Sequence, residues 1–293
     1  MSILVDRTSR VIIQGITGAA AARHAGIMLE CGTRLVGGVA PGRGGQRVEG
    51  LPVFDTVREA VALVGADVSL IFLSAAHVRD AILEAAANGI GTIVCITEGV
   101  PVCDMLLVAQ RLRGCASRLI GPNCPGIISP GGAKVGIMPA SAFQPGRVGV
   151  ISRSGTLGYE ISRGLSQACY GQSTFVGIGG DPLTGSTFEG LMPLFEADPE
   201  TDAVVIAGEI GGGAEEAAAR YVAAHMRKPV VAFIAGREAP PEQRMGHAGA
   251  IISGEVGSWA AKAAALTEAG IPLADSPFEI PALLRERGVP PAR

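Results

Sequence analysis

Residues 10–21, which read RVIIQGITGAAA, set the fold of the N-terminal half. The apolar run at 10–15 predicts a short buried strand, Gly15 and Gly18 predict a tight turn, and the alanines that follow open a helix over 19–31. A strand that passes through a glycine turn into a helix is the first unit of a parallel α/β sheet. Such a turn directs backbone N–H groups and the positive end of a helix dipole at one point, which predicts a phosphate-binding site.

The residues around this turn restrict the class of ligand that it can bind. The glycine spacing is not the G-x-G-x-x-G of dinucleotide-binding proteins. The next predicted strand ends near Arg43, a cation where an NAD site has a carboxylate for the ribose. The turn therefore favours a phosphate-bearing ligand other than NAD. A tight turn without a ligand accounts for the same glycines, because every doubly wound sheet needs short connections.

Short β-branched runs alternate with alanine-rich segments of helical length through most of the chain, a pattern typical of βαβ units. The first series has predicted strands near 10–15, 33–39, 67–74, 91–96 and 118–121 and helices near 19–31, 56–64, 77–88 and 102–113. The second series has strands near 147–151, 173–178, 203–208 and 229–235 and helices near 155–168, 186–196, 213–226, 256–269 and 276–287. Between the two series glycine and proline crowd together, which predicts an irregular connector. We expect a doubly wound domain over 1–125, a connector over 126–146 and a flavodoxin-like domain over 147–293, both with parallel sheets.

Composition excludes several classes of protein. The 293 residues leave room for two domains with their own cores, and 48% hydrophobic against 17% charged residues predicts a globular chain rather than a disordered one. The 24 basic and 27 acidic residues give a net charge of −3 without a basic block, so no nucleic-acid partner is expected. No run approaches the length of an apolar membrane span or forms a secretory signal. We expect a cytoplasmic protein with no membrane partner.

The cysteines agree with a reducing compartment. None of the six forms a C-x-x-C pair, so free thiols are expected, and no metal site is predicted. They are Cys31, Cys95, Cys103, Cys115, Cys124 and Cys169.

Two motifs of the second series can serve an anion. The sequence SRSGT at 152–156 follows a predicted strand and begins a helix, so hydroxyls and backbone N–H groups converge there; ordinary helix capping explains it equally well. Glu209, in the sequence GEIGGG, follows another strand at the carboxyl edge where open α/β sheets bind ligands. An exposed loop acid is the alternative interpretation.

His247 is the candidate catalytic group. It stands between two glycines in the sequence RMGHAGA, residues 244–250, on a predicted loop. A neutral imidazole is a nucleophile near neutral pH, and a carboxylate such as Glu209 can orient it and stabilise the charge that develops on attack.

Five motifs together resemble one known family. GPNCPG, SRSGTLGYE, VGIGGDP, GEIGG and RMGHAGA occur in this order, and the chain from MSILVD through its last helix resembles the α subunit of succinyl-CoA synthetase (succinate–CoA ligase). The resemblance implies a CoA-binding Rossmann-like domain followed by a flavodoxin-like ligase domain, active only with a β subunit that carries an ATP-grasp nucleotide site. None of the three lysines lies in a Walker A sequence, which fits a nucleotide site on another chain.

The resemblance also implies roles for individual residues. His247 is the expected phosphohistidine, Glu209 its carboxylate partner, and Tyr159 a substrate contact; Ser154, Gly155 and Thr156 are the helix start that holds the phosphoryl group. The residues matching the CoA site are Thr17, Gly18, Ala19, Ala20, Arg43, Ile96, Thr97 and Glu98, with Cys124 near the expected thiol end. Two positions depart from the family: Ala19–Ala21 replaces polar residues and a glycine, and Arg43 replaces a lysine. The alanines remove side-chain contacts to CoA but leave the backbone N–H groups, and Arg43 is still a cation but with a different donor geometry.

The reaction implied is the reversible formation of succinyl-CoA from succinate, CoA and ATP or GTP, through a phosphohistidine and an acyl phosphate. The nucleotide and its Mg²⁺ are expected mainly on the β subunit, in a heterodimer or a heterotetramer. The small subunit of malate–CoA ligase, or of a ligase for a related dicarboxylate, shares these motifs and is the closest alternative. A non-catalytic CoA- or NAD-binding protein is an alternative of another class.

Overall fold

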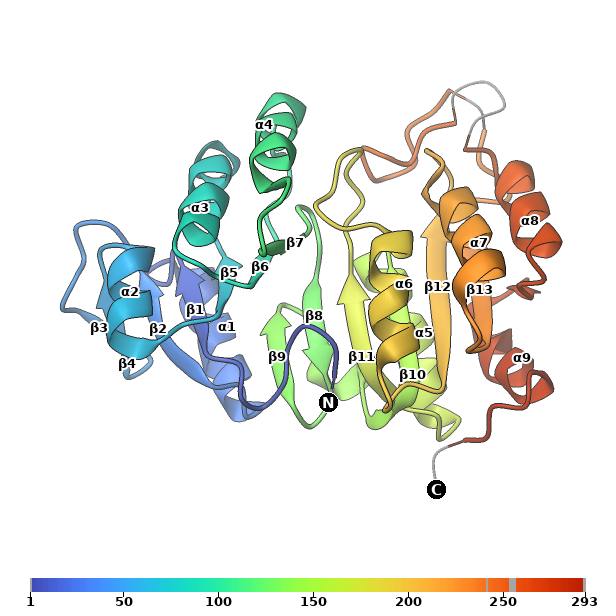
Figure 1. Ribbon diagram of the computed structural model, residues 1–293, viewed down its shortest axis with the longest axis horizontal. Helices are drawn as coiled ribbons and strands as arrows, with labels where there is room; N and C mark the ends of the chain where they lie inside the picture. The colour runs from blue at the N-terminus through green and yellow to red at the C-terminus, as the bar shows by residue number, and fades with distance from the viewer. Residues whose placement is uncertain (1, 241, 253–256, 292–293) are drawn as a thin grey trace.

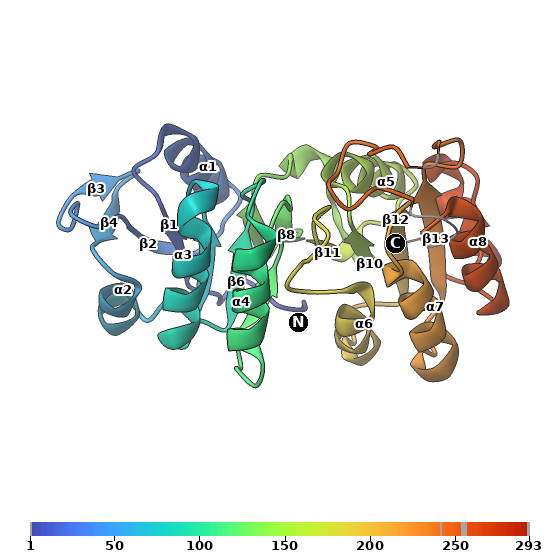
Figure 2. The same cartoon turned by 90° about the horizontal axis from the view of Figure 1, so that it is seen from above.

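Two seven-stranded sheets lie side by side along the molecule, each with helices on both faces (Figure 1 and Figure 2). The computed structural model describes residues 2–240, 242–252 and 257–291. The expected α/β class with two sheets, one after the other in the chain, is confirmed.

The first sheet has the strand order of a Rossmann fold. Its elements are β1 (Val11–Gln14), α1 (Ala19–Glu30), β2 (Leu35–Val39), β3 (Arg47–Val48), β4 (Leu51–Phe54), α2 (Val57–Val64), β5 (Val68–Ile71), α3 (Ala75–Ala87), β6 (Thr92–Cys95), α4 (Val102–Leu112) and β7 (Arg118–Ile120). The order β3-β4-β2-β1-β5-β6-β7 contains six parallel strands arranged 3-2-1-4-5-6 when β3 is set aside. The order reverses between β1 and β5, so a ligand is expected at the carboxyl ends of these strands.

The second sheet has a flavodoxin-like order. Its elements are β8 (Gly126–Ser129), β9 (Ala133–Gly136), η1 (Ala140–Ala142), β10 (Pro145–Ser152), α5 (Gly155–Gln167), β11 (Gln172–Gly177), α6 (Phe188–Ala197), β12 (Ala203–Glu209), α7 (Ala214–His225), β13 (Val230–Ala235), α8 (Trp259–Glu268), β14 (Leu273–Ala274), η2 (Pro277–Glu279) and α9 (Ile280–Glu286). Strands β11, β10, β12, β13 and β14 are parallel in the order 2-1-3-4-5. The order reverses between β10 and β12.

The stretch expected to be an irregular connector contains two strands. Residues 126–136 form the antiparallel pair β8 and β9, and β8 pairs antiparallel with β11, so the second sheet is mixed at this edge. Glycine permits this pairing: Gly126 has φ +110°, and a Cβ atom there would lie 2.1 Å from the carbonyl oxygen of Val135. The residues that break the sequence pattern are therefore the ones that let two strands approach. The domain limits at 125 and 147 stay a prediction.

Three smaller differences concern one additional strand pair and the ends of two helices. The antiparallel pair β3 and β4 occupies a segment for which no strand is predicted. The expected helix over 276–287 is divided, because Ser276 caps the short turn η2 and α9 begins only at Ile280. The helix expected over 256–269 begins at Trp259, where Ser258 Oγ accepts a hydrogen bond from the Ala261 N–H; residue 256 lies outside the described residues.

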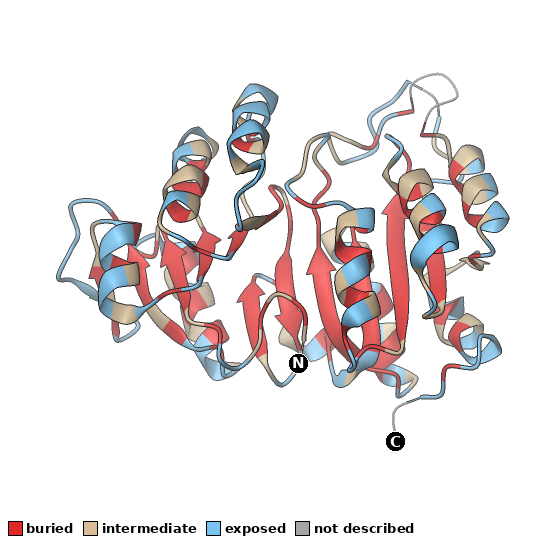
Figure 3. Cartoon of the chain, viewed as in Figure 1, coloured by how far each residue is buried: buried red, intermediate tan, exposed pale blue. Residues whose placement is uncertain are grey.

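The two sheets are packed against each other rather than joined by a free linker. The strands form the buried interior of both halves (Figure 3), and one hydrophobic cluster extends from Met28 of α1 to Val135 of β9 and on into the second sheet. Thr33 Oγ1 donates to the carbonyl oxygen of Lys134 at 2.8 Å and accepts from its N–H at 2.9 Å. This contact connects the amino end of β2 in the first sheet to β9 of the second sheet.

Candidate active site

His247 and Glu209 form a hydrogen-bonded pair at the carboxyl edge of the second sheet. Glu209 is the last residue of β12, and His247 lies in the loop between β13 and α8. His247 Nδ1 is 2.8 Å from Glu209 Oε2 and 3.0 Å from Oε1. The carboxylate is 9% exposed and the imidazole 30% exposed. With Nδ1 facing Glu209, the ring offers its Nε2 atom to a reaction partner.

Charges around the ring oppose one another. The hydrogen bond that His247 donates to Glu209 raises the pKa of His247, burial lowers it, and the Coulomb interactions with Glu209 and Asp181 raise it further. The positive charge of Arg153 works in the other direction. A nucleophilic imidazole must be neutral, so Arg153 counteracts a pair that otherwise favours the imidazolium.

The loop that carries His247 is held by backbone contacts. The Gly249 N–H donates to the carbonyl oxygen of Gly180 at 2.9 Å, and the Met245 N–H donates to Ala250 at 2.8 Å. Gly246 has φ +81°, which favours glycine immediately before the histidine. The predicted glycine-flanked loop therefore places the imidazole in one position against Glu209.

The helix start predicted to bind phosphate lies on the neighbouring strand. Ser154 is the N-cap of α5, and its Oγ accepts a hydrogen bond from the Leu157 N–H at 3.4 Å. Gly155 and Thr156 form the first turn, where backbone N–H groups have no partner within the helix. Because β10 pairs with β12, this helix start and Glu209 emerge at the same edge of the sheet. Capping is compatible with the predicted anion binding, because the Ser154 hydroxyl accepts from one N–H group and leaves the others of the first turn available.

Tyr159 lies one turn further along α5. Its ring packs against Phe143 at 6.2 Å and Phe175 at 6.3 Å between centroids, and burial raises the pKa of its hydroxyl to about 12. The hydroxyl is therefore protonated at neutral pH and can donate a hydrogen bond. With Thr156, Glu160 and Arg163 it lines a cavity of about 290 Å³.

The residues matched to CoA gather at the carboxyl edge of the first sheet. Thr17 to Ala20 follow β1 and are exposed, Arg43 follows β2 and is exposed, and Ile96 to Glu98 follow β6. A cavity of about 460 Å³ lies at the ends of β1, β2 and β5, lined by Gly15, Pro41 and residues of α3. Gly18 caps α1, and a Cβ atom there would meet only the Gly15 carbonyl oxygen at 3.4 Å. The space above the turn is open to a ligand.

Cys124 lies deeper than its expected role requires. Its side chain is 4% exposed, its thiol donates to the Cys95 carbonyl oxygen at 3.2 Å, and burial raises its pKa well above the usual range. Cys124 is thus a neutral packed thiol, and its proximity to the thiol end of CoA stays a prediction.

The two edges meet across a chain of backbone hydrogen bonds. The Asn123 N–H donates to Thr97 at 2.9 Å, and the Gly180 N–H donates to Asn123 at 3.3 Å, next to the Gly249 contact. The Asn123 amide also donates to Asp181 at 2.9 Å. The predicted CoA loop is thereby connected to the histidine loop.

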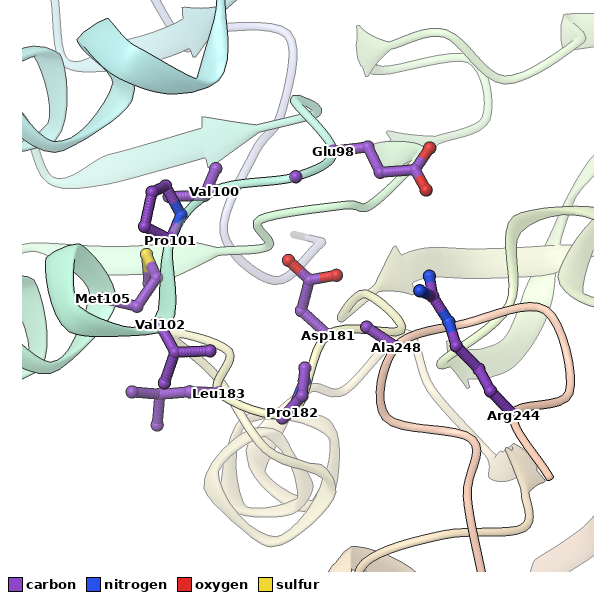
Figure 4. Close-up of a pocket in the computed structure, with 11 residues that line it drawn as sticks. Glu98, Val100, Pro101, Val102, Met105, Asp181, Pro182, Leu183, Arg244 and Ala248 are labelled. Carbon is purple, nitrogen blue, oxygen red and sulfur yellow. The ribbon is translucent and has the colours of Figure 1, made fainter. Parts of the chain in front are cut away.

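A cavity of about 300 Å³ opens at this junction (Figure 4). Glu98 reaches it from the first domain, and Asp181, Arg244 and Ala248 reach it from the second. Sequence reasoning quoted the motifs that contain Asn123, Gly180 and Asp181 but assigned them no role. Their function depends on a contact between distant segments, which spacing along one chain does not reveal.

Among residues 2–240, 242–252 and 257–291, no group of three or more His, Cys, Asp or Glu side chains is arranged to hold a metal ion. Over the same residues no helix combines the length and apolar character that crossing a bilayer requires.

Two family models match the chain. The model described as CoA binding domain matches residues 6–99, and the model described as CoA-ligase matches residues 151–271. The first range lies within the half of the chain that forms the first sheet and the second range within the half that forms the second sheet; β7, β8 and β9 lie between the two ranges.

Curated relatives match nearly the whole chain. The succinate–CoA ligase [ADP-forming] subunit alpha 1 of Archaeoglobus fulgidus is 54% identical over 280 residues, covering 96% of both chains. The succinate–CoA ligase [ADP-forming] subunit alpha of Staphylococcus aureus (strain Mu50) is 51% identical over 286 residues, covering 98% of this chain and 95% of that one.

Solved structures share the fold. The ATP citrate lyase of Methanosaeta concilii in complex with (3S)-citryl-CoA matches with a TM-score of 0.86 at 25% identity over 98% of this chain. An acetyl-coenzyme A synthetase of Ca. Korarchaeum cryptofilum matches with a TM-score of 0.72 at 22% identity over 92% of this chain. This chain spans 52% and 58% of those longer chains. From its sequence identity over almost its full length, the chain belongs to the family of succinate–CoA ligase alpha subunits.

Proposed function

We propose that this chain is the alpha subunit of an ADP-forming succinate–CoA ligase in which His247 carries the phosphoryl group. The observation that carries the proposal is the Glu209–His247 pair, with Nδ1 held at 2.8 Å and Nε2 left for attack. The helix start at Ser154 emerges at the same edge and supports a phosphoryl group close to the histidine. We also propose that the site works in the cytoplasm and that the domains divide near residues 125 and 147.

The proposed reaction has three steps. His247 Nε2 attacks the terminal phosphorus of the nucleoside triphosphate, the bond to the bridging oxygen breaks, and the diphosphate leaves. A carboxylate oxygen of succinate then takes the phosphoryl group from Nε2, which gives an acyl phosphate and regenerates the imidazole. The CoA thiol loses its proton, its sulfur attacks the acyl carbon, and inorganic phosphate leaves. Phosphorylation is needed because a free carboxylate has no competent leaving group.

The chain's own residues provide orientation and charge for these steps. Glu209 accepts the Nδ1–H bond and stabilises positive charge as Nε2 attacks. The backbone N–H groups of Gly155 and Thr156 offer donors to the phosphoryl oxygens, and Tyr159 offers a hydroxyl to the carboxylate substrate. Thr17 to Ala20 and Arg43 are proposed to hold the CoA phosphates, and Ile96 to Glu98 to guide its thiol arm toward the junction with Cys124.

The nucleotide is proposed to bind mainly on a β subunit with an ATP-grasp domain, together with Mg²⁺. That subunit supplies the positive charge that phosphoryl transfer requires. ATP is the proposed nucleotide, because the curated relatives are named ADP-forming, and GTP is the alternative; a heterodimer and a heterotetramer are both compatible with this chain.

The test uses the chain assembled with its β subunit. The assembly should form succinyl-CoA from succinate, CoA and ATP or GTP, and in the absence of succinate and CoA it should retain label from the γ-phosphate in an acid-labile, base-stable form. His247→Asn should abolish both, while circular dichroism shows an intact fold. A label that persists in His247→Asn contradicts the assignment. Turnover of malate or itaconate in place of succinate would keep the mechanism and change the substrate.

A further inference from the structure

A row of buried charged side chains lies behind Glu209. Lys262 of α8 forms an ion pair with Glu215 of α7, and both side chains are 0% exposed. Glu215 Oε1 is 3.3 Å from the guanidinium of Arg153, whose other nitrogen is 3.5 Å from Glu209 Oε1. Glu209 contacts His247 in turn. Three ion pairs and the Glu209–His247 hydrogen bond thus connect a fully buried lysine to the proposed phosphohistidine.

Arg153 is the centre of this row. Its guanidinium donates to the carbonyl oxygens of Gly211 at 2.9 Å and Glu209 at 3.3 Å, and its side chain is 7% exposed. Its two carboxylate neighbours are Glu209 and Glu215, and both attract the guanidinium. Glu215 also accepts the Glu209 N–H at 3.2 Å, so it touches both the arginine and the strand end that carries the carboxylate.

Lys262 weakens the attraction between Glu215 and Arg153. Its ammonium donates to Glu215, to Glu216 at 3.0 Å and to the Gly212 carbonyl oxygen at 2.9 Å. Burying an ammonium and a carboxylate carries a desolvation cost that an apolar pair of the same size avoids. Because Lys262 neutralises Glu215, the charge of Arg153 remains available to Glu209.

We propose that Lys262 and Glu215 are positioning residues that hold Arg153 against Glu209 and thereby set the orientation and charge of the Glu209–His247 pair. The inference rests on the proposed function of His247. Neither residue touches a substrate; each acts through Arg153.

Removing either charge should shift the pKa of His247 in a direction that the proposal predicts. The charged groups that face His247 are Glu209 at the end of β12, Arg153 after β10 and Asp181 after β11. Arg153 lowers the pKa of the imidazole, while the two carboxylates raise it. Without Lys262, the uncompensated Glu215 attracts the guanidinium, and the pKa of His247 rises. Without the charge of Glu215, Arg153 belongs to Glu209 alone and the pKa falls.

The experiment measures the single-turnover rate of His247 phosphorylation against pH in the assembled enzyme, for Lys262→Met, for Glu215→Gln and for both together. We expect the acidic limb to move up by about half a unit in Lys262→Met and down by a similar amount in Glu215→Gln. The double variant removes one charge of each sign, so its limb should return close to that of the wild type. If Lys262→Met does not fold, the direction of the Glu215→Gln shift decides.

Lys134→Met is the matched control. Lys134 is 1% exposed and donates to the Gly136 carbonyl oxygen, but it lies in β9 at the far edge of the second sheet. This variant should lose stability and keep the wild-type pH profile. Unshifted profiles in Glu215→Gln and the Lys262 variant, or shifts of the same sign in both, overturn the proposal. Absence of label in the wild type would instead overturn the proposed function of His247.

Discussion

A Cβ atom placed on Gly180 would lie 2.3 Å from Cγ of the His247 ring. The backbone of residue 180 therefore forms the surface on which the imidazole rests, and the same residue accepts the Gly249 N–H through its carbonyl oxygen. Only a residue without a side chain leaves the ring in hydrogen-bond distance of Glu209. Gly180, the second glycine of the GGDP sequence, thus affects the reaction by leaving room for the ring and not by any chemistry of its own.

Gly180→Ala should slow phosphorylation of His247 by at least about tenfold, because a shift of about 1 Å in a reacting group costs one to two orders of magnitude in rate. The measurement is single-turnover labelling in the assembled enzyme, with thermal unfolding to show that the fold persists. Gly164→Ala is the control: Gly164 lies within α5 and a Cβ atom there meets nothing within 4 Å. It should keep the rate and stabilise the helix by up to about 1 kcal/mol. An unchanged rate in Gly180→Ala would mean that the ring tolerates displacement.

The rate of His247 phosphorylation should rise with pH through a pKa above the usual value of histidine, because Glu209 raises the pKa of the ring and only the neutral imidazole attacks. Glu209→Gln should lower the maximum rate and move the acidic limb to lower pH. The raised pKa also stabilises the fold at acidic pH, and this contribution is lost as the pH rises through the folded-state pKa. Glu209→Gln should therefore reduce Tm more at pH 5.5 than at pH 8. If the acidic limb of the pH–rate profile does not move in Glu209→Gln, Glu209 does not raise the pKa of His247.

The fold was predictable wherever one pattern dominates a segment. The run at 10–21 gives β1, the glycine turn and α1, and the alternation of β-branched and alanine-rich segments predicts both parallel sheets. The pair β8 and β9 was not predictable, because Gly126 and Gly136 look like loop residues in the sequence. Only the structure shows that their lack of a side chain lets the neighbouring backbone approach. Local sequence does not encode that tertiary contact.

The candidate site shows the same division. His247 and Glu209 are 38 residues apart, and the sequence indicated each for a different reason. Glu209 follows a predicted strand at the carboxyl edge of the sheet, and His247 is flanked by glycines on a predicted loop. Arg153 and Lys262 gave no comparable signal, since a lysine in an alanine-rich helix predicts a surface residue. Burial converts it into a functional candidate, and burial appears only when α7 and α8 pack together.

Gly18→Val should raise the CoA concentration needed for half-maximal rate by an order of magnitude or more and leave His247 phosphorylation unchanged. The residue caps α1 with open space above it, so a bulky side chain obstructs an approaching phosphate rather than the fold. Arg43→Ala should weaken CoA by about tenfold, as expected for one exposed charge contact. Gly15→Ala is the contrast, because its φ is +84° and a Cβ atom would lie 2.5 Å from the Phe72 carbonyl oxygen, so it should lose stability. If both the Gly18 and the Arg43 variants bind CoA as tightly as the wild type does, the CoA site does not lie at this edge of the sheet.

The isolated chain should bind CoA but take no label from a nucleoside triphosphate. Phosphoryl transfer needs positive charge around the transferring group, and this chain has three lysines, none of them in a glycine-rich nucleotide loop. Lys262 is occupied by two carboxylates inside the second domain, and Lys134 lies in β9. We expect the β subunit to supply the further positive charge, through an interface near His247 and the start of α5 of roughly 2,000 Å² or more, as in obligate complexes. The measurement compares labelling of the chain alone with labelling after the β subunit is added, at equal triphosphate and magnesium concentrations. Stoichiometric labelling of His247 by the chain alone would place the nucleotide site within this chain and remove the need for a partner.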